Sequence, residues 1–518
     1  MKAIASVSDK TGLVELARGL VGLGVEIYST GGTLDVLQKA SVPARSVSDL
    51  TGFPEILEGR VKTLHPAVHG GILARRESPE HMAQLQQHGI STIDLVIVNL
   101  YPFTQTIERP GTTLAQAIEN VDIGGPTLLR AAAKNFAHVI PIVDPDDYGL
   151  VLAGLQAGGI DLPTRQRLAA KAFQHTATYD THVAGYLRDE PDQLPERFTI
   201  ALEKLEDLRY GENPHQKGAL YAQTPNLRRG ATLVGAQQLA GRPISFTDTL
   251  DVDAALACVR DFAAMTVAVV KHGNPCGLAC GDDLADTYRR AHAGDPQAAV
   301  GGCLGFNRPL DAPTAGLIAR TYYEDIVAPG YAEDALATLI AANKDLRLFR
   351  VDFTPLDEAA LRVSPTLTLD LKRISGGFLV QTPDIQGQDE ISYKVASARE
   401  PTLEELTDLM FAWRAVKHVR SNAVVLARRL ALVGVGAGQM SRADATEIAI
   451  RKAGERAVGA VMASDAFFTA PDGVELAADA GVTAIVQPGG SIRDEEIIKA
   501  ANKHHIAVVL TGYRHFKH

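Results

Sequence analysis

Cysteine is scarce in this sequence, and the spacing of the few cysteines argues against a metal site. Four cysteines occur in 518 residues, Cys258, Cys276, Cys280 and Cys303, which is too few for a disulfide framework. The zinc signature of nucleotide deaminases needs Pro-Cys-x-x-Cys and an upstream His-x-Glu. Here three residues separate Cys276 from Cys280, and no histidine is followed two places later by glutamate. We therefore expect no metal site.

Aromatic residues, positive net charge and long apolar runs are also lacking. One tryptophan and an aromatic content of 6% argue against a large stacking or carbohydrate-binding surface. A net charge of −10 argues against general binding to nucleic acid or anionic membranes, although local basic residues can still hold a small phosphate ligand. No apolar run reaches the roughly 20 residues of a membrane helix, and the first residues lack a signal-peptide pattern. We expect a cytoplasmic protein.

The alternation of strand and helix signals predicts an α/β protein with more than one domain. A chain of 518 residues is too long for a single hydrophobic core. Strand patterns alternate with helix patterns, the strands at residues 2–7, 25–29, 95–99 and 139–143 and the helices at 12–23, 33–39 and 126–135. This order predicts a doubly wound parallel sheet with helices on both faces, in which ligands bind at the carboxyl ends of the strands.

A second α/β region is expected beyond a linker. Residues 163–187 have a helical pattern, and the charged, proline-rich stretch 188–197 that follows is typical of a linker. The polar stretch 382–390 divides the region beyond it. Strand patterns recur there at residues 267–270, 423–426, 457–462, 483–486 and 507–510. We expect domains at residues 1–145, 200–380 and 381–518, and a helical segment and linker at 146–199.

Two hydroxyl-rich loops follow the first two predicted strands. Ser-Val-Ser-Asp-Lys-Thr-Gly occupies residues 6–12, and Ser-Thr-Gly-Gly-Thr occupies residues 29–33. Glycines let backbone N–H groups approach a ligand closely, the N-terminus of a helix favours anions, and Lys10 adds a charged donor. Because both loops lie at equivalent strand ends, we favour a phosphate site over ordinary turns.

Further polar residues lie between these loops and the third predicted helix. Arg60 and Lys62 fall with two histidines in an apolar, glycine-rich segment, which suggests an anionic ligand. Tyr101 follows the most apolar strand pattern, where site residues are expected. Asp122 could cap the next helix, but it lies several residues before the expected N-cap. Lys134, taken alone, is better explained as part of a solvated helix face.

The β-branched run at residues 267–270 ends in Lys271 and His272 and continues into a predicted Gly-Asn-Pro turn. A buried strand that delivers an ammonium group and an imidazole to a loop is a common way to place acid–base chemistry. The alternative is a strand end whose charged residues face water. Two other segments suggest ligand binding. Arg209 could pair with phosphate beside a stacking Tyr210, and the Gly-x-Gly-x-Gly run at 434–438 is weak evidence for a nucleotide loop.

The order of these motifs resembles the family that joins aminoimidazole carboxamide ribotide (AICAR) transformylase to inosine monophosphate (IMP) cyclohydrolase. The resemblance covers nearly the whole chain. It implies a methylglyoxal-synthase-like fold for the first domain and a pair of cytidine-deaminase-like α/β domains without zinc for the rest. It is carried by Ser-Asp-Lys-Thr-Gly, Ser-Thr-Gly-Gly-Thr, Arg-Val-Lys-Thr-Leu-His-Pro, Asn-Leu-Tyr-Pro-Phe, Asp-Ile-Gly-Gly-Pro and Lys-His-Gly-Asn-Pro, and by the segments around Arg209, Asn422, Gly436, Ser464 and Gly490.

The resemblance also implies the chemistry of each half. A formyl group passes from 10-formyltetrahydrofolate, a reduced folate, to AICAR, and the formylated product FAICAR closes to IMP with loss of water. The residues implied for ring closure are Lys62, Tyr101, Asp122 and Lys134. Those implied for nucleotide binding beside them are Ser8, Lys10, Thr11, Ser29, Thr30, Gly31, Gly32, Thr33, Arg60 and Thr63.

For formyl transfer the resemblance implies Lys271, His272 and Asn422 as catalytic groups. The binding residues it implies there are Arg209, Tyr210, Arg442, Phe467 and Asp472. It further implies a homodimer with small-molecule substrates, and it adds a structural monovalent cation as a candidate ligand.

The chain departs from the family at three places: it lacks the paired asparagines that are usual near residues 245–248, and two loops each lose an aromatic ring. The family usually has phenylalanine where this chain has Val300, and again where it has Ala470. We therefore keep two alternatives, a cyclohydrolase with an impaired transformylase half and a nucleotide-binding regulatory protein. The joint presence of Lys62, Tyr101, Asp122 and Lys134 argues against the second, because phosphate sensing needs only the phosphate loops.

Overall fold

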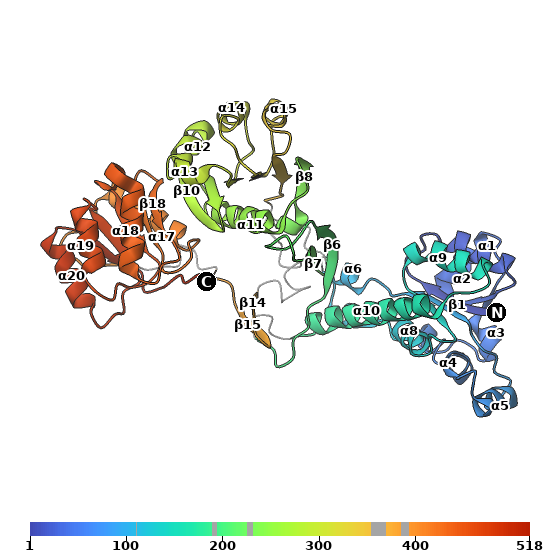
Figure 1. Cartoon of the computed structure of the whole chain (residues 1–518). Coiled ribbons are helices and arrows are strands. Elements are labelled where there is room, and N and C mark those ends of the chain that lie inside the picture. Colours follow the sequence, from blue (N-terminus) through green and yellow to red (C-terminus); the bar gives the residue numbers. More distant parts are fainter. Residues whose placement is uncertain (110, 189–193, 225–231, 354–368, 385–392) are drawn as a thin grey trace. The chain divides into compact units, whose positions relative to one another are not determined.

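The computed structural model of the chain describes residues 1–109, 111–188, 194–224, 232–353, 369–384 and 393–518. These residues form two compact units, one built on residues 1–201 and the other on residues 202–353 and 370–518 (Figure 1). Parts of the predicted linker and of the predicted dividing stretch, 189–193 and 385–390, lie outside the described residues.

The first unit is built on a five-stranded parallel sheet of order β3-β2-β1-β4-β5. The chain adds β2 and β3 on one side of β1 and then β4 and β5 on the other, so the order reverses between β1 and β4. Ligands bind at such a switch point, at the carboxyl ends of the strands. The strands are β1 (Lys2–Val7), β2 (Glu26–Ser29), β3 (Ala44–Ser46), β4 (Leu95–Asn99) and β5 (Ile140–Ile142).

Helices cover both faces of this sheet, as the side chains of β4 demonstrate. Leu95 and Ile97 are buried in one hydrophobic cluster, and Val96 and Val98 are buried in another on the opposite face. The predicted doubly wound parallel sheet is confirmed. The helices are α1 (Leu13–Gly22), α2 (Gly31–Lys39), α3 (Val47–Thr51), α4 (Pro66–Leu73), α5 (Pro79–Gln87), α6 (Phe103–Ile107), α7 (Leu114–Glu119), α8 (Gly124–Lys134), α9 (Tyr148–Gln156) and α10 (Leu162–Tyr186), with 3-10 turns η1 (Leu57–Gly59) and η2 (Pro145–Asp147).

The second unit contains two six-stranded mixed sheets that share one topology. The first has the order β10-β9-β11-β12-β13-β8, and the second, read in the same sense, has the order β18-β17-β19-β20-β21-β16. In each sheet an antiparallel hairpin comes first, the third strand is antiparallel to it, two parallel strands follow, and an antiparallel strand closes the far edge. The predicted pair of α/β domains is therefore confirmed as a structural duplication.

The strand bounds of the two sheets follow the same order along the chain. The first sheet contains β8 (Gln237–Ala240), β9 (Met265–Lys271), β10 (Asn274–Gly281), β11 (Cys303–Phe306), β12 (Asp325–Ala328) and β13 (Arg347–Arg350). The second contains β16 (Lys394–Val395), β17 (Val424–Ala427), β18 (Leu432–Gly436), β19 (Val461–Ser464), β20 (Ala484–Gln487) and β21 (Ala507–Leu510). Two separate hairpins are β6 (Leu202–Leu208) with β7 (Gly218–Gln223) and β14 (Asp370–Ile374) with β15 (Gly377–Gln381).

The helices repeat as well, because α11 (Phe246–Arg260) and α17 (Leu403–Val416) each precede a hairpin, and α12 (Leu284–His292) and α18 (Arg442–Ala453) each follow one. One hydrophobic cluster takes residues from both halves, including Leu256 and Val270 from the first and Trp413 and Val425 from the second. The halves thus share a core. The remaining helices are α13 (Pro296–Ala299), α14 (Ala312–Ile318), α15 (Glu333–Ala342), α19 (Asp472–Asp479) and α20 (Asp494–Lys503), with 3-10 turns η3 (Leu233–Gly235) and η6 (Gly454–Ala457).

The prediction of a glycine-rich loop at 434–438 is wrong, because Gly434 and Gly436 lie inside strand β18. A Cβ at Gly434 would come within 2.1 Å of the carbonyl oxygen of Ala449, and a Cβ at Gly436 would meet that of Ala445 at 1.9 Å. These glycines therefore let α18 pack directly on its strand. A search of the described helices finds none that is both long and apolar enough to span a membrane.

Candidate active sites

The first candidate site begins with the loop after β1, which the side chain of Asn99 holds in place. Asn99 ends β4, and its Oδ1 accepts hydrogen bonds from the backbone N–H groups of Ser8 (2.6 Å) and Asp9 (2.8 Å). Its Nδ2 donates to the carbonyl of Asp9 at 3.0 Å. The sequence analysis did not single out Asn99, although a polar residue ending a fully buried strand was the available signal.

Hydroxyl groups join this loop to the one after β2. Ser29 Oγ donates to the carbonyl of Ala5 at 2.7 Å, and Thr33 Oγ1 is bonded to both backbone groups of Val7. Thr30 Oγ1 lies 3.4 Å from Ser6 Oγ. Gly31 opens α2 with a φ of +46°, in the region that favours glycine. The two predicted phosphate loops are thus adjacent at the carboxyl edge, and Ser29 and Thr33 use their hydroxyls to build it.

Lys10 and Thr11 are engaged within the first of these loops. Lys10 Nζ donates to the carbonyls of Val7 (3.1 Å) and Ser8 (3.3 Å). Thr11 Oγ1 donates to Asp9 Oδ1 at 2.7 Å, and this bond lowers the pKa of the Asp9 carboxyl. Ser8, Lys10 and Thr11 therefore lie together as predicted, and their contact with a nucleotide stays a prediction.

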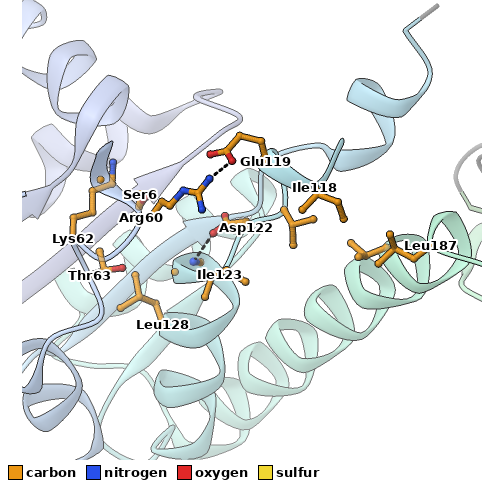
Figure 2. Close-up of a pocket in the computed structure, with 15 residues that line it drawn as sticks. Ser6, Arg60, Lys62, Thr63, Ile118, Glu119, Asp122, Ile123, Leu128 and Leu187 are labelled. Atoms are coloured by element: carbon orange, nitrogen blue, oxygen red, sulfur yellow. Dashed lines mark hydrogen bonds and ion pairs between the residues drawn. The ribbon is translucent and has the colours of Figure 1, made fainter. Parts of the chain in front are cut away.

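A cavity of about 530 Å³ lies next to these loops and brings together residues from distant parts of the sequence. Figure 2 shows Arg60, Lys62 and Thr63 on one side and Asp122 on the other. Thr63 Oγ1 is close enough to Gly124 that a Cβ there would meet it at 2.8 Å. Apolar residues complete the wall, namely Ile118, Val121, Ile123, Leu128, Val183 and Leu187.

Lys62 connects the cavity to the phosphate loops. Its Nζ would lie 3.6 Å from a Cβ added at Gly31, so the ammonium group is next to the first residue of α2. Arg60 forms an ion pair with Glu119 across the cavity mouth, and both side chains are more than half exposed. An exposed ion pair contributes little stability, so Arg60 can exchange this partner for an anionic ligand.

Asp122 does cap the following helix, contrary to the sequence-based argument. The helix was expected to start at Pro126, but α8 begins at Gly124, and Asp122 Oδ1 accepts the N–H of Gly125 at 2.8 Å. Its own backbone N–H donates to the hydroxyl of Tyr179 at 2.7 Å. Among the described residues, none donates to Asp122 Oδ2, which leaves one carboxylate oxygen for a ligand.

Tyr101 and Lys134 are not among the residues that line this cavity. Tyr101 follows β4, and 40% of it is exposed. Lys134 is exposed in the last turn of α8, about 15 Å along the helix from Gly124 at 1.5 Å per residue. The structure does not bring Lys134 to Asp122, and the roles predicted for Tyr101 and Lys134 stay predictions.

The second candidate site lies at the turn between β9 and β10. The expectation of a Gly-Asn-Pro turn is wrong. The central turn residues are His272 and Gly273, with φ values of +52° and +70°, while Asn274 and Pro275 already belong to β10. Positive φ at both positions is the signature of a type I′ hairpin turn. This turn leaves His272 exposed, and Lys271 Nζ donates to the carbonyl of Val300 at 2.5 Å.

The Val300 contact bears on the alternative of an impaired transformylase half. Lys271 is anchored by the main chain of Val300, so its position does not depend on the side chain that differs from the family. That side chain is 47% exposed. The substitution therefore leaves the lysine contact intact and changes only the surface beside it.

Asn422 is joined to this turn through Asn274. The Asn274 Nδ2 donates to the carbonyl of His272 at 3.0 Å, and its Oδ1 accepts the backbone N–H of Arg420 at 2.9 Å. Asn422 lies two residues beyond Arg420, and its side chain donates to the carbonyl of Gln439 at 2.9 Å. These bonds connect the Lys271–His272 turn to the segment that contains Asn422, and the catalytic role of Asn422 stays a prediction.

Arg442 is buried, and both of its terminal nitrogens donate to protein groups. It forms an ion pair with Asp465, and it donates to Ser464 Oγ and to Asn422 Oδ1, each at 2.8 Å. The arginine was predicted to bind nucleotide, a role that stays a prediction. In the structure it orients the side chain of Asn422.

The remaining predicted binding residues lie at loop positions. Arg209 and Tyr210 follow β6, with the guanidinium 5.6 Å from the ring centroid. Phe467 is half-buried after β19, and Asp472 is exposed at the start of α19. None of the bonds in the described part of the chain connects these four residues to Lys271 or His272.

The cysteines of β10 have the chemistry of buried thiols. Burial raises the pKa of Cys276 to about 12, and it also raises the pKa of Cys280, whose thiol is hydrogen-bonded to Thr266. Metal binding needs the thiolate form. Within the described ranges, no three His, Cys, Asp or Glu side chains are grouped as a metal site requires.

Two family models match the chain. The model of the MGS-like domain matches residues 12–127, and that of the AICARFT/IMPCHase bienzyme matches residues 132–452, more than half of the chain. A parallel sheet with helices on both faces, followed by a duplicated mixed α/β unit, is the architecture that carries these two matches, and the matches define the class as a bienzyme. The chain belongs to the AICARFT/IMPCHase bienzyme family and is a bifunctional enzyme.

Curated relatives resemble the chain over its full length. The bifunctional purine biosynthesis protein PurH of Halalkalibacterium halodurans is 51% identical over 100% of this chain and 99% of its own. The proteins of the same name from Anoxybacillus flavithermus and Bacillus thuringiensis subsp. konkukian are 49% and 48% identical with the same coverage.

Proposed function

We propose that this bifunctional enzyme of purine biosynthesis closes the ring of FAICAR in the cavity of its first unit. The preceding formyl transfer, which produces FAICAR from AICAR and 10-formyltetrahydrofolate, takes place beside the Lys271–His272 turn. The observation that carries the proposal is the convergence of Lys62 and Asp122 on one cavity next to the two phosphate loops. A regulatory module would need the loops but not this pair.

Ring closure needs orientation and proton transfer. The carboxamide nitrogen of FAICAR attacks its own formyl carbon, and the hydroxyl of the resulting carbinol leaves as water. Because both groups belong to one molecule, holding them in place supplies much of the rate. In this proposal Asp122 Oδ2 accepts the amide proton and Lys62 stabilises the developing oxyanion. Arg60, Thr63 and the loop residues hold the phosphate and ribose, while Tyr101 and Lys134 remain candidates.

Formyl transfer needs a base because the 5-amino group of AICAR is conjugated with its imidazole ring. His272 removes a proton from this amine as the nitrogen attacks the formyl carbon. Lys271 stabilises the tetrahedral oxyanion and protonates the folate nitrogen that leaves. Asn422 orients the carboxamide, and Arg442 acts through Asn422. Arg209, Tyr210, Phe467 and Asp472 complete the proposed binding surface.

Three further assignments belong to the same proposal. They are a homodimer, a structural monovalent cation in the second unit and a cytoplasmic location, and membership of the family supports each of them. Size measurement of the purified protein in solution tests the first of these directly.

Two single variants test the assignment of one reaction to each site. In Lys62→Gln, FAICAR should accumulate while AICAR is still consumed, and in His272→Gln, added FAICAR should still be converted to IMP. Each variant should lower the rate of its own step by about 10² to 10⁴, the usual contribution of a positioned acid–base group. Both rates are followed by separating AICAR, FAICAR and IMP chromatographically.

The controls decide between the alternatives. Glu15→Gln, on helix α1, should leave both rates unchanged. If the wild-type protein binds AICAR but converts neither AICAR nor FAICAR, the regulatory alternative replaces this proposal. If each variant abolishes both steps, the division of the two reactions between the units is wrong.

A further inference from the structure

We propose that Asp251 is a positioning residue for formyl transfer, because it holds the Lys271–His272 turn in its active shape. The proposal rests on the assignment of that turn to formyl transfer. Asp251 lies on α11, and its two carboxylate oxygens accept the two consecutive N–H groups at the centre of the turn. Oδ2 is bonded to His272 at 3.1 Å and Oδ1 to Gly273 at 2.6 Å.

The turn needs such a partner because of its backbone conformation. His272 has a φ of +52°, a region that residues with a side chain rarely adopt. The central N–H groups of a two-residue turn point away from the strand pairing, so they depend on another acceptor. An ionised carboxylate bonds to both at once, and charge-assisted bonds are shorter and stronger than those to a neutral amide.

The shape of the turn decides where three site groups lie. Lys271 immediately precedes it, with Nζ bonded to Val300. Asn274 immediately follows it and connects the carbonyl of His272 to Arg420, two residues before Asn422. A turn that relaxed to another conformation would therefore move the lysine, the imidazole and the link to Asn422 together.

The duplicated half contains the same cap without the same chemistry. Asp408 on α17 accepts the N–H groups of Arg429 (2.7 Å) and Leu430 (2.6 Å), and these residues have φ values of +53° and +54°. Asp251 and Asp408 are both half-buried. The aspartate cap thus occurs in both halves of the unit. Of the two capped turns, only the one beside Asp251 contains a lysine followed by a histidine.

This duplication supplies a matched control for the experiment, in which Asp251→Asn and Asp408→Asn are compared in the full-length enzyme. We expect Asp251→Asn to lower kcat of formyl transfer by about tenfold to a hundredfold, the scale of a small misplacement of reacting groups. KM for AICAR should change by less than about threefold, because an interaction that acts only in the transition state affects kcat and leaves substrate binding unchanged. Asp408→Asn should leave kcat within about twofold. Both variants should show a similar drop in melting temperature.

Two further measurements keep the result interpretable. Conversion of FAICAR to IMP, carried out by the other unit of the same chain, should be unchanged in both variants. Asp251→Glu, which keeps two charged acceptors, should recover part of the lost kcat. Equal losses of formyl transfer in Asp251→Asn and Asp408→Asn would show a structural role only and would overturn the proposal.

His272→Gln, assayed in parallel, distinguishes a failure of the positioning role of Asp251 from a failure of the proposed formyl-transfer site. If that variant loses formyl transfer while Asp251→Asn keeps it, the positioning role is wrong and the proposed site stands. If His272→Gln keeps full formyl transfer, the turn is not the site of that reaction, and the positioning role is overturned with it.

Discussion

At Gly125 the absence of a side chain is what allows Asp122 to reach the cavity. A Cβ at Gly125 would lie 2.6 Å from Asp122 Oδ2 and 2.6 Å from Leu100 Cδ2. Real Cβ atoms do not tolerate such contacts, so the carboxylate or the end of the β4 loop would have to move. Gly125 therefore fixes both the capping bond of Asp122 and the direction of its unbonded oxygen.

We expect Gly125→Ala to lower the rate of ring closure by at least about tenfold, because overpacking of this kind costs roughly 1–3 kcal/mol. Formyl transfer should be unaffected. The matched control is Gly149→Ala, also at the second position of a helix in the same unit, where a Cβ meets nothing within 4 Å. The two half-reactions are assayed separately, and equal rates of ring closure in both variants would contradict the prediction.

At the scale of elements, α10 supports the β4 loop through a half-buried histidine. His175 Nε2 accepts the backbone N–H of Leu100, the residue before Tyr101, at 3.3 Å. This bond requires the ring to be neutral with its proton on Nδ1. Burial lowers the pKa of His175 below its ordinary value of 6.5, which keeps the ring neutral near pH 7.

This bond predicts a loss of stability in mild acid. Because the unfolded chain takes up the proton with the ordinary pKa of 6.5 and the folded chain only at lower pH, the folded state loses stability as the pH falls below about 6.5. His175→Gln offers an acceptor that does not titrate. Between pH 7 and 5.5 its melting temperature should fall less steeply than that of the wild type. His88→Gln, at an exposed histidine, should follow the wild type, and parallel slopes for all three proteins would contradict the prediction.

Elements could be predicted from the sequence where their signal is local, and site contacts could not where their partners are distant. The apolar run of β4 and the order of strands and helices in the first unit were sufficient to predict a parallel sheet. The contacts of Asn99 with Ser8 and of Asp251 with His272 join residues that are 91 and 21 positions apart. The hydrophobic periodicity of the sequence does not predict such contacts. Helix starts at glycine, such as Gly124, were missed because apolar periodicity begins only later.

At the scale of the whole molecule, the two halves of the second unit are held together by more than their shared core. Asp261, at the end of α11, is bonded to Lys417 Nζ (2.8 Å) and His418 Nε2 (2.7 Å) at the end of α17. Burial opposes ionisation of Asp261, but these two bonds outweigh it and hold the pKa of the carboxyl well below its usual range. The pair of helices thus carries both apolar and charged contacts between the sheets.

We therefore expect the two sheets of this unit to unfold as one cooperative body. In hydrogen exchange at increasing denaturant, the amides of β9 and β17 should become exposed with the same free energy of opening. Asp261→Ala should lower that free energy for both strands by on the order of 2 kcal/mol, since it leaves the Lys417 ammonium group and the His418 ring without their acceptor. Exchange of β17 while β9 remains protected would show that the halves open separately.

The pair of aspartate caps also bears on which side chains these turns can carry. A carboxylate that bonds only to backbone N–H groups does not discriminate among the side chains that the turn presents. The cap is therefore compatible with different residues in the turn, provided that they adopt a positive φ. One copy now presents Lys271, His272 and Gly273, and the other presents Arg428, Arg429 and Leu430 on the same backbone. The same capped turn can therefore carry acid–base side chains in one half of the unit and have a purely structural role in the other half.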